Sequence, residues 1–128
     1  MSDPSSKTIL IADDEPDVRS YMTVLLKDNG YNIILAENGR EAFEKAVSEK
    51  PDLISLDISM PEESGTKAFK DLQENEVTKD IPVIIVSGVD PRYEAFLSKR
   101  KLIKPPSGYF EKPIDREEFL KKVEELTK

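Results

Sequence analysis

Three short and almost continuous apolar runs constrain the fold of this chain more than any other feature. They occupy residues 7–12, 53–57 and 82–87, and they are rich in the β-branched residues that favour strands. A strand without a polar face is typical of a sheet that is covered on both sides. Because helices supply that cover, the runs predict an α/β domain with a parallel sheet.

Segments with helical periodicity separate these runs. Pro16 suits a first helical turn, and Asn29–Gly30 suits a helix end. Asn38 and Asp115 each precede a glutamate by three residues, which is typical of a helix N-cap. Two weaker strands are expected at 31–36 and 108–111, and helices are expected over 16–28, after Asn38, over 64–74, over 91–101 and after Asp115. Right-handed crossovers then give a doubly wound, five-stranded parallel α/β sheet.

Composition limits the class of protein. The chain has 128 residues, so we expect one domain over residues 7–128 after a flexible tail at 1–6. It has neither cysteine nor histidine, which excludes disulfides and thiolate zinc sites. A net charge of −7 argues against direct nucleic-acid binding, and no apolar run reaches the ~18–20 residues of a membrane helix. With no signal peptide pattern at the start, we expect a cytoplasmic location.

Polar residues stand where four of the five strands end. Asp13 and Asp14 follow the first strand, Asp57 ends the third, Ser87 ends the fourth, and Lys112 follows the fifth. The carboxyl ends of parallel strands share one edge of the sheet, and ligands of such folds bind there. We therefore expect three acids, a hydroxyl and a lysine to face one cleft.

This set of residues suits phosphoryl chemistry with a hard cation. Three clustered carboxylates repel one another unless a cation is present, and oxygen ligands suit Mg²⁺. With Mg²⁺ and Lys112, the three negative charges are balanced, so the site can accept a phosphoryl group. Taken singly, an acidic pair often caps a helix, and a serine before glycine often lies in a turn. Asp57 at the end of a buried run is harder to explain without a function, and we interpret it as the nucleophile.

Four motifs together give the chain its resemblance to a known family. They are IADDEP at residues 11–16, LDISMPEESG at 56–65, IIVSG at 84–88 and GYFEKP at 108–113. In this order they resemble the receiver domain of two-component response regulators, the chemotaxis-type receivers, over residues 7–127. The resemblance implies a flavodoxin-like (βα)5 fold with strand order 2-1-3-4-5.

The resemblance also implies a role for each site residue. Asp57 resembles the phospho-acceptor, and Ser87 and Lys112 resemble the hydroxyl and the ammonium that contact the phosphoryl group. The Mg²⁺ ligands would be Asp14, Asp57 and the Ser59 backbone carbonyl, with Asp13 holding the ion through water. Ser87 and Tyr109 resemble the switch pair, and Pro113 resembles the proline of a cis peptide bond.

A receiver is a phosphorylation-controlled switch that catalyses only its own phosphorylation and dephosphorylation, so we do not expect an enzyme in the usual sense. The resemblance implies a histidine kinase or phosphotransfer protein as donor. It implies a downstream protein or output domain that binds the face of helix 4, strand 5 and helix 5. The family often has Met-Asp-Gly where residues 63–65 read Glu-Ser-Gly, and the segment 99–108 is longer than usual.

Three other functions are weighed against this one. A Mg²⁺-dependent phosphatase with an aspartyl nucleophile usually has a second acid two residues after the nucleophile, where this chain has Ser59. A flavin- or nucleotide-binding domain of similar fold would have a glycine-rich loop after the first strand, where this chain has Asp-Asp-Glu-Pro. A degenerate receiver that only binds partners would not need the complete set of acid, hydroxyl and lysine.

Overall fold

Five parallel strands form one sheet in the order β2–β1–β3–β4–β5. The computed structural model describes residues 7–58, 60, 64–88 and 106–128. The elements in chain order are β1 (Thr8–Ala12), α1 (Pro16–Lys27), β2 (Asn32–Ala36), α2 (Gly39–Glu49), β3 (Leu53–Asp57), α3 (Ser64–Glu74), β4 (Val83–Ser87), β5 (Gly108–Glu111) and α5 (Arg116–Leu126).

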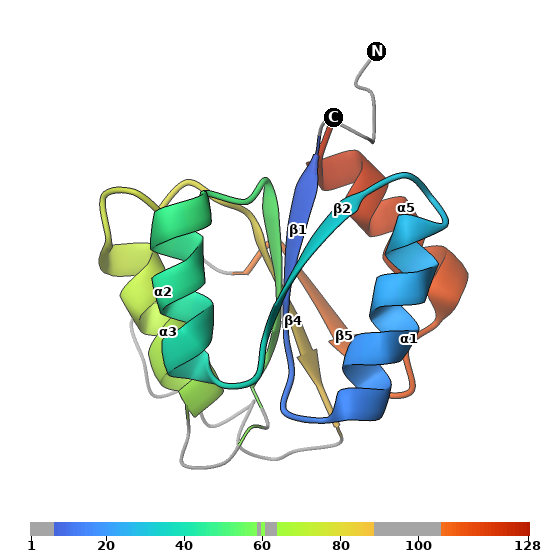
Figure 1. Ribbon diagram of the computed structural model, residues 1–128, viewed down its shortest axis with the longest axis horizontal. Coiled ribbons are helices and arrows are strands. Elements are labelled where there is room, and N and C mark those ends of the chain that lie inside the picture. The colour runs from blue at the N-terminus through green and yellow to red at the C-terminus, as the bar shows by residue number, and fades with distance from the viewer. Residues whose placement is uncertain (1–6, 59, 61–63, 89–105) are drawn as a thin grey trace.

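The sheet lies between two helical layers, with α2 and α3 on one face and α1 and α5 on the other (Figure 1). Successive side chains of a strand point to opposite faces, so each strand contributes to two cores. In β1, Leu10 and Ala12 pack in the core under α2 and α3, whereas Ile9 and Ile11 pack in the core under α1 and α5. This alternation decides on which face each residue at a strand end lies.

The position of each strand in the sheet explains its composition. Every residue of β3 and β4 is buried, as is every residue of β1 except the first. The edge strands β2 and β5 are mostly half-buried or exposed. The three apolar runs therefore mark the three central strands, as expected for a sheet covered on both faces.

Local signals set the helix ends. The Asn38 side chain accepts a hydrogen bond from the Glu41 N–H, and the Asp115 side chain accepts one from the Glu118 N–H. Pro16 is the first residue of α1. After α1 ends at Lys27, Gly30 has a φ of 93°, a value that glycine adopts readily.

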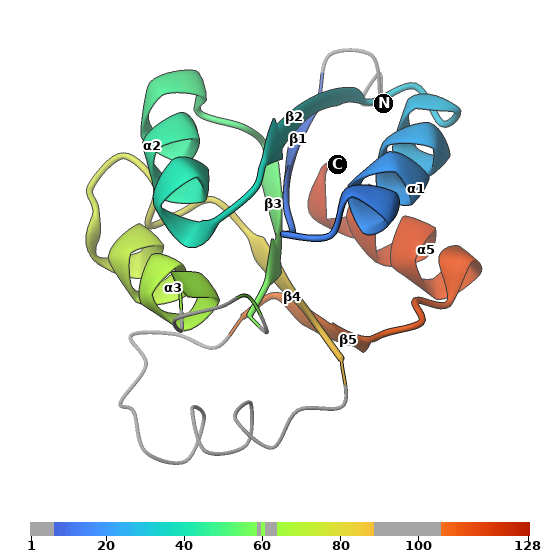
Figure 2. The same cartoon turned by 60° about the horizontal axis from the view of Figure 1, so that its bottom comes forward.

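The carboxyl ends of the strands lie together at one end of the molecule, which Figure 2 turns toward the viewer. Sheet topology and strand order are as the sequence predicts. Three strands begin one residue later than expected, at Thr8, Asn32 and Val83. The helix expected over 91–101 and the tail at 1–6 lie outside the described residues. Within the described ranges, the helices are all too short or too polar to cross a membrane.

Candidate functional site

Four carboxylates meet where β1 and β3 end. Asp13, Asp14, Glu15 and Asp57 each place an oxygen within 4.8 Å of the others, and we call this group the acidic cluster. Asp13 and Asp57 are only 1% exposed, whereas Asp14 and Glu15 are exposed. Adjacent pairing of β1 with β3 brings these two strand ends together. The sequence predicted three of these acids and omitted Glu15.

Lys112 supplies the positive charge of the site. Its Nζ lies 2.9 Å from Glu15 Oε1, 3.0 Å from Asp13 Oδ2 and 3.1 Å from Asp57 Oδ2. The Lys112 side chain is 17% exposed, so these ion pairs are screened less than ordinary surface pairs. Asp57, Asp13 and Lys112 continue the alternation of the strand residues that face α1 and α5. Three of the predicted site residues are therefore in contact on one face.

Asp13 is held from several sides but is not fully satisfied. Its Oδ1 accepts a hydrogen bond from the Glu15 N–H at 2.9 Å, and its backbone carbonyl accepts one from Arg19 Nη1 at 2.7 Å. Arg19 Nη2 also lies 3.4 Å from Glu37 at the end of β2. Among the described residues, Asp13 Oδ2 is buried without a well-formed hydrogen bond, although Lys112 Nζ is close to it.

The electrostatics follow from this burial. Desolvation raises the pKa of Asp13 to about 6, and the Asp57 charge acts in the same direction, against the Glu15 N–H and Lys112. Burial alone would lower the pKa of Lys112. Its close contacts with the Glu15 and Asp13 carboxylates and the charge of Asp57 outweigh burial, so that the pKa of Lys112 lies above its usual value.

The acidic cluster fits a divalent cation. Its donors are all oxygens, and one carboxylate oxygen of Asp13 is buried without a well-formed hydrogen bond to any residue that the structure describes. Hard cations such as Mg²⁺ prefer oxygen ligands, and such an ion would complete the environment of this atom. The three acids predicted as ligands, Asp13, Asp14 and Asp57, all belong to the acidic cluster, and their role as ligands stays a prediction. Ser59, whose carbonyl was also expected to bind the ion, lies outside the described residues.

Ser87 and Tyr109 belong to the opposite face of the sheet. Ser87 shares its face with Val83 and Ile85, and its hydroxyl donates to the Gly88 carbonyl at 2.9 Å. Tyr109 pairs with Ile85 in register and packs against the core under α2 and α3. The Ser87 hydrogen bond is to the backbone of the next residue, and the expectation that the Ser87 hydroxyl faces the same cleft as the acids stays a prediction. The Lys112–Pro113 peptide bond is cis.

Two further residues, Gly65 and Arg19, position the site, and neither was predicted from the sequence. Gly65 lies so close to the end of β3 that a Cβ there would be 2.3 Å from the Asp57 carbonyl oxygen and 2.5 Å from Ile58 Cα. Arg19 connects the Asp13 backbone to β2 through the contacts above. Glu15 could have been predicted, since it follows the acidic pair directly. Arg19 had no comparable signal, because its role depends on how α1 packs.

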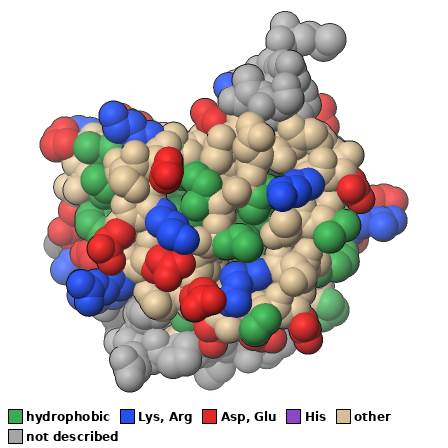
Figure 3. Space-filling view, in the orientation of Figure 1, with side chains coloured by type: hydrophobic (Ala, Val, Ile, Leu, Met, Phe, Trp, Pro, Cys, Tyr) green, Lys and Arg blue, Asp and Glu red, His purple; other side chains and the backbone are tan. Residues whose placement is uncertain are grey.

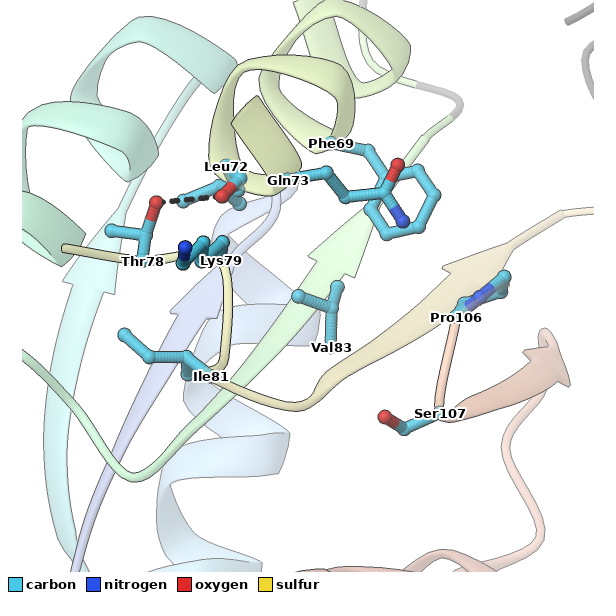
Figure 4. A pocket seen from close by; sticks show the side chains of 9 residues that line it. All are labelled: Phe69, Leu72, Gln73, Thr78, Lys79, Ile81, Val83, Pro106 and Ser107. Carbon is cyan, nitrogen blue, oxygen red and sulfur yellow. Dashed lines mark hydrogen bonds between the residues drawn. The ribbon is translucent and has the colours of Figure 1, made fainter. Parts of the chain in front are cut away.

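Other charged and hollow regions differ from this site. On the face shown in Figure 3, acidic and basic side chains are interspersed. Several of these charges form exposed i,i+4 pairs on helices, such as Glu41–Lys45 and Lys67–Asp71. A hollow at the amino ends of β4 and β5 has mainly apolar and neutral walls (Figure 4), formed by Phe69, Leu72, Gln73, Thr78, Lys79, Ile81, Val83, Pro106 and Ser107. It lies opposite the edge at which ligands of this fold bind.

Comparison with known proteins agrees with this geometry. Residues 9–124 match the response regulator receiver domain. The chain is 36% identical over 115 residues to protein PilH of Pseudomonas aeruginosa, covering 90% of this chain and 93% of PilH. Among solved structures, chemotaxis response regulator CheY4 of Vibrio cholerae has a TM-score of 0.78 at 25% identity, covering 94% of this chain and 98% of CheY4.

Other similar proteins are larger or more distant. The chain spans 35% of the phosphate regulon regulator PhoB of Pseudomonas aeruginosa and 48% of the regulator PhoP of Bacillus subtilis. The receiver domain of sensor histidine kinase PA1611 from Pseudomonas aeruginosa has a TM-score of 0.82 at 22% identity, covering 94% of this chain and 97% of that one. Its structure has a magnesium ion coordinated in the active site cleft.

Proposed function

The chain belongs to the response regulator receiver domain family, and on that premise we propose that Asp57 is its phospho-acceptor. Receivers of two-component systems are signalling switches rather than enzymes of the usual kind. The observation that carries the proposal is the position of Asp57. It is 1% exposed, ends a central strand and lies 3.1 Å from Lys112 within the acidic cluster. A buried carboxylate needs such partners, and the same partners suit phosphoryl transfer.

Mg²⁺ is the proposed cofactor, and the acidic cluster would hold it. Asp14 and Asp57 would bind the ion directly with the Ser59 carbonyl, and Asp13 would bind it through water. When bound, the ion shares the negative charge of the phosphoryl group. The magnesium ion in the PA1611 receiver domain belongs to a protein of the same fold.

Lys112 is the proposed contact for a phosphoryl oxygen. Its ammonium already lies between the Asp13 and Asp57 carboxylates, and its raised pKa keeps it charged at neutral pH. An ammonium is a compact point charge with three donors, so it can turn from a carboxylate to a phosphoryl oxygen without leaving the site. We assign it to charge stabilisation rather than to proton transfer.

Ser87 and Tyr109 are the proposed switch. Tyr109 on β5 is in register with Ile85, which precedes Ser87 by two residues on β4. Ser87 and Tyr109 are therefore diagonal neighbours on the same face of adjacent strands. Rotation of the Ser87 hydroxyl from the Gly88 carbonyl toward a phosphoryl oxygen would change the space next to Tyr109. A local charge event would then bias a two-state element.

The proposed donor is a histidine kinase or a phosphotransfer protein, because this chain has no histidine. The proposed output surface is the face of helix 4, β5 and α5, of which helix 4 lies outside the described residues. No membrane insertion and no direct nucleic-acid contact are proposed. The cytoplasmic location and the division into a tail at 1–6 and a domain at 7–128 stay predictions.

Intact-mass spectrometry tests this function. After incubation with acetyl phosphate and Mg²⁺, we expect the wild-type chain to gain the mass of one phosphoryl group. Asp57→Asn should gain none, whereas Asp80→Asn, which changes an exposed acid, should behave as wild type. A gain that persists in Asp57→Asn, or no gain in wild type, would overturn the proposal. Sustained turnover of a small phosphate ester would support the aspartyl phosphatase instead.

A further inference from the structure

Glu15 is the member of the acidic cluster to which the proposed chemistry gives no role. Its carboxylate is within 4.8 Å of the Asp13, Asp14 and Asp57 carboxylates, yet its side chain is 59% exposed. It therefore lies at the mouth of the site, whereas Asp13 and Asp57 lie at its base. Its contact with Lys112, at 2.9 Å, is the shortest of the three ion pairs that the lysine makes.

The hydrogen bonds of Lys112 show what this contact does. Lys112 donates well-formed hydrogen bonds to Glu15 and to Asp57. The buried Asp13 Oδ2 is 3.0 Å from the same nitrogen but makes no well-formed hydrogen bond with any described residue. An unsatisfied buried oxygen is unfavourable, so the orientation of the ammonium reflects competition among the three carboxylates. Glu15 at the mouth of the site thus shares one ammonium with Asp13 and Asp57 at its base.

Glu15 also changes the charge of the site. The four carboxylates carry −4 and Lys112 carries +1, so the cluster carries −3 in total. A divalent cation would bring this to −1, whereas the count without Glu15 gives zero. A dianionic phosphoryl donor would thus approach a site of the same sign, and the exposed Glu15 carboxylate adds to that negative charge. The same negative charge attracts the cation.

We propose that Glu15 is a positioning residue that holds Lys112 before phosphorylation, so that it tightens Mg²⁺ binding and slows phosphoryl transfer. This inference rests on the proposed function. In the transfer from an acyl phosphate, one Asp57 oxygen bonds to phosphorus. The bond from phosphorus to the acyl oxygen breaks, and its electron pair leaves on the carboxylate product. Lys112 must exchange Glu15 for a phosphoryl oxygen as this occurs.

Two measurements on Glu15→Gln test the proposal. Titration calorimetry with MgCl₂ should show an affinity lower by about twofold to fivefold, the range that an exposed ion pair corresponds to. The initial rate of phosphorylation by acetyl phosphate at saturating Mg²⁺ should rise by a similar factor of about two to five. Damage to the fold would lower both the Mg²⁺ affinity and the phosphorylation rate. A lower affinity together with a higher rate is therefore specific to the proposed role.

Asp17→Asn is the matched control, because it removes one negative charge from an exposed residue of the first turn of α1 that is not part of the acidic cluster. It should leave affinity and rate at their wild-type values. The proposal is overturned if the rate of Glu15→Gln at saturating Mg²⁺ is unchanged or lower, or if Asp17→Asn reproduces its effects. If wild type is not phosphorylated at all, the proposed function fails first and this inference falls with it.

Discussion

The ends of β3 and β4 differ, although the two strands are neighbours and equally buried. β3 ends in Asp57, which faces α1 and α5 and contacts Lys112 at 3.1 Å. β4 ends in Ser87, which faces α2 and α3 and donates to the carbonyl of the next residue. The first end is organised by long-range charge and the second by a local backbone contact. Under the proposed function, a signal that begins at Asp57 would cross the sheet to reach Tyr109, and Ser87 would carry it.

The largest difference between the two strand ends should appear in glycine substitutions. Gly65→Ala places a Cβ 2.3 Å from the Asp57 carbonyl oxygen, and only backbone movement could relieve the clash. We expect a loss of about 3 kcal/mol in the free energy of unfolding, as for overpacking in a core. Urea unfolding followed by circular dichroism measures it.

Gly88→Ala is the control at the end of β4, where a Cβ would meet no atom of the described residues within 4 Å. Its free energy of unfolding should differ from wild type by less than about 0.5 kcal/mol, as for most surface changes. Equal effects at Gly65 and Gly88 would contradict the view that the end of β3 is the more tightly constrained one.

The next effect concerns the charge that organises the end of β3. Lys112→Gln leaves the Asp13 and Asp57 carboxylates without their cation, and we expect a loss of about 2 kcal/mol in Mg²⁺-free buffer at pH 7. Mg²⁺ replaces part of the missing charge, so it should raise the melting temperature of this variant more than that of wild type.

Lys122→Gln serves as the control for that variant. Lys122 lies on α5 and pairs at 3.8 Å with the exposed Glu125, so the loss of its charge should have little effect. A Lys112→Gln protein as stable as wild type would show that the ion pairs at the site contribute nothing. A smaller response to Mg²⁺ than in wild type would show that lysine and cation do not substitute for each other.

A smaller effect should follow from the pKa of Asp13. Because burial raises this pKa from 3.8 to about 6, the folded protein binds a proton more tightly than the unfolded chain between these values. The contribution of Asp13 to stability therefore falls as pH rises from about 4 to about 6, by roughly 1–3 kcal/mol. Asp13→Asn removes this titration, so its advantage over wild type should grow across that range in Mg²⁺-free buffer.

Unfolding in urea at pH 4.5 and at pH 7.5 measures this difference. The other acids titrate in both proteins, so the gap between wild type and Asp13→Asn isolates Asp13. A gap that is constant or that narrows at the higher pH would mean that burial does not raise the pKa of this carboxyl.

Much of the fold was predictable because local signals and burial agree along the chain. The apolar runs became the central strands, and Asn38 and Asp115 cap their helices as expected. Strand order was inferred from resemblance alone, since no local signal encodes it. Three strands begin one residue later than predicted. The sequence signal for the start of a strand is weaker than the signal from its buried centre.

The site was predictable in its members but not in its contacts. Because parallel strands share one edge, the sequence predicted that Asp13, Asp14, Asp57 and Lys112 lie close together, and the structure places them so. Their roles stay predictions. Ser87 and Asp57 lie on opposite faces of the sheet, because side chains alternate along each strand. Which face the last residue of a strand occupies depends on where that strand ends. Packing between elements decides which atoms Gly65, Glu15 and Arg19 contact. No single segment of the sequence encodes that packing.

The account is tested most directly by nuclear magnetic resonance with beryllofluoride, an analogue of the phosphoryl group. In wild type with Mg²⁺, we expect amide shifts at Asp57 and Lys112 and also at Tyr109 on the opposite face. In Ser87→Ala, the shifts at Asp57 and Lys112 should remain while those at Tyr109 are lost. Shifts confined to the acidic cluster in wild type, or a response of Tyr109 that persists without the Ser87 hydroxyl, would contradict coupling across the sheet through Ser87.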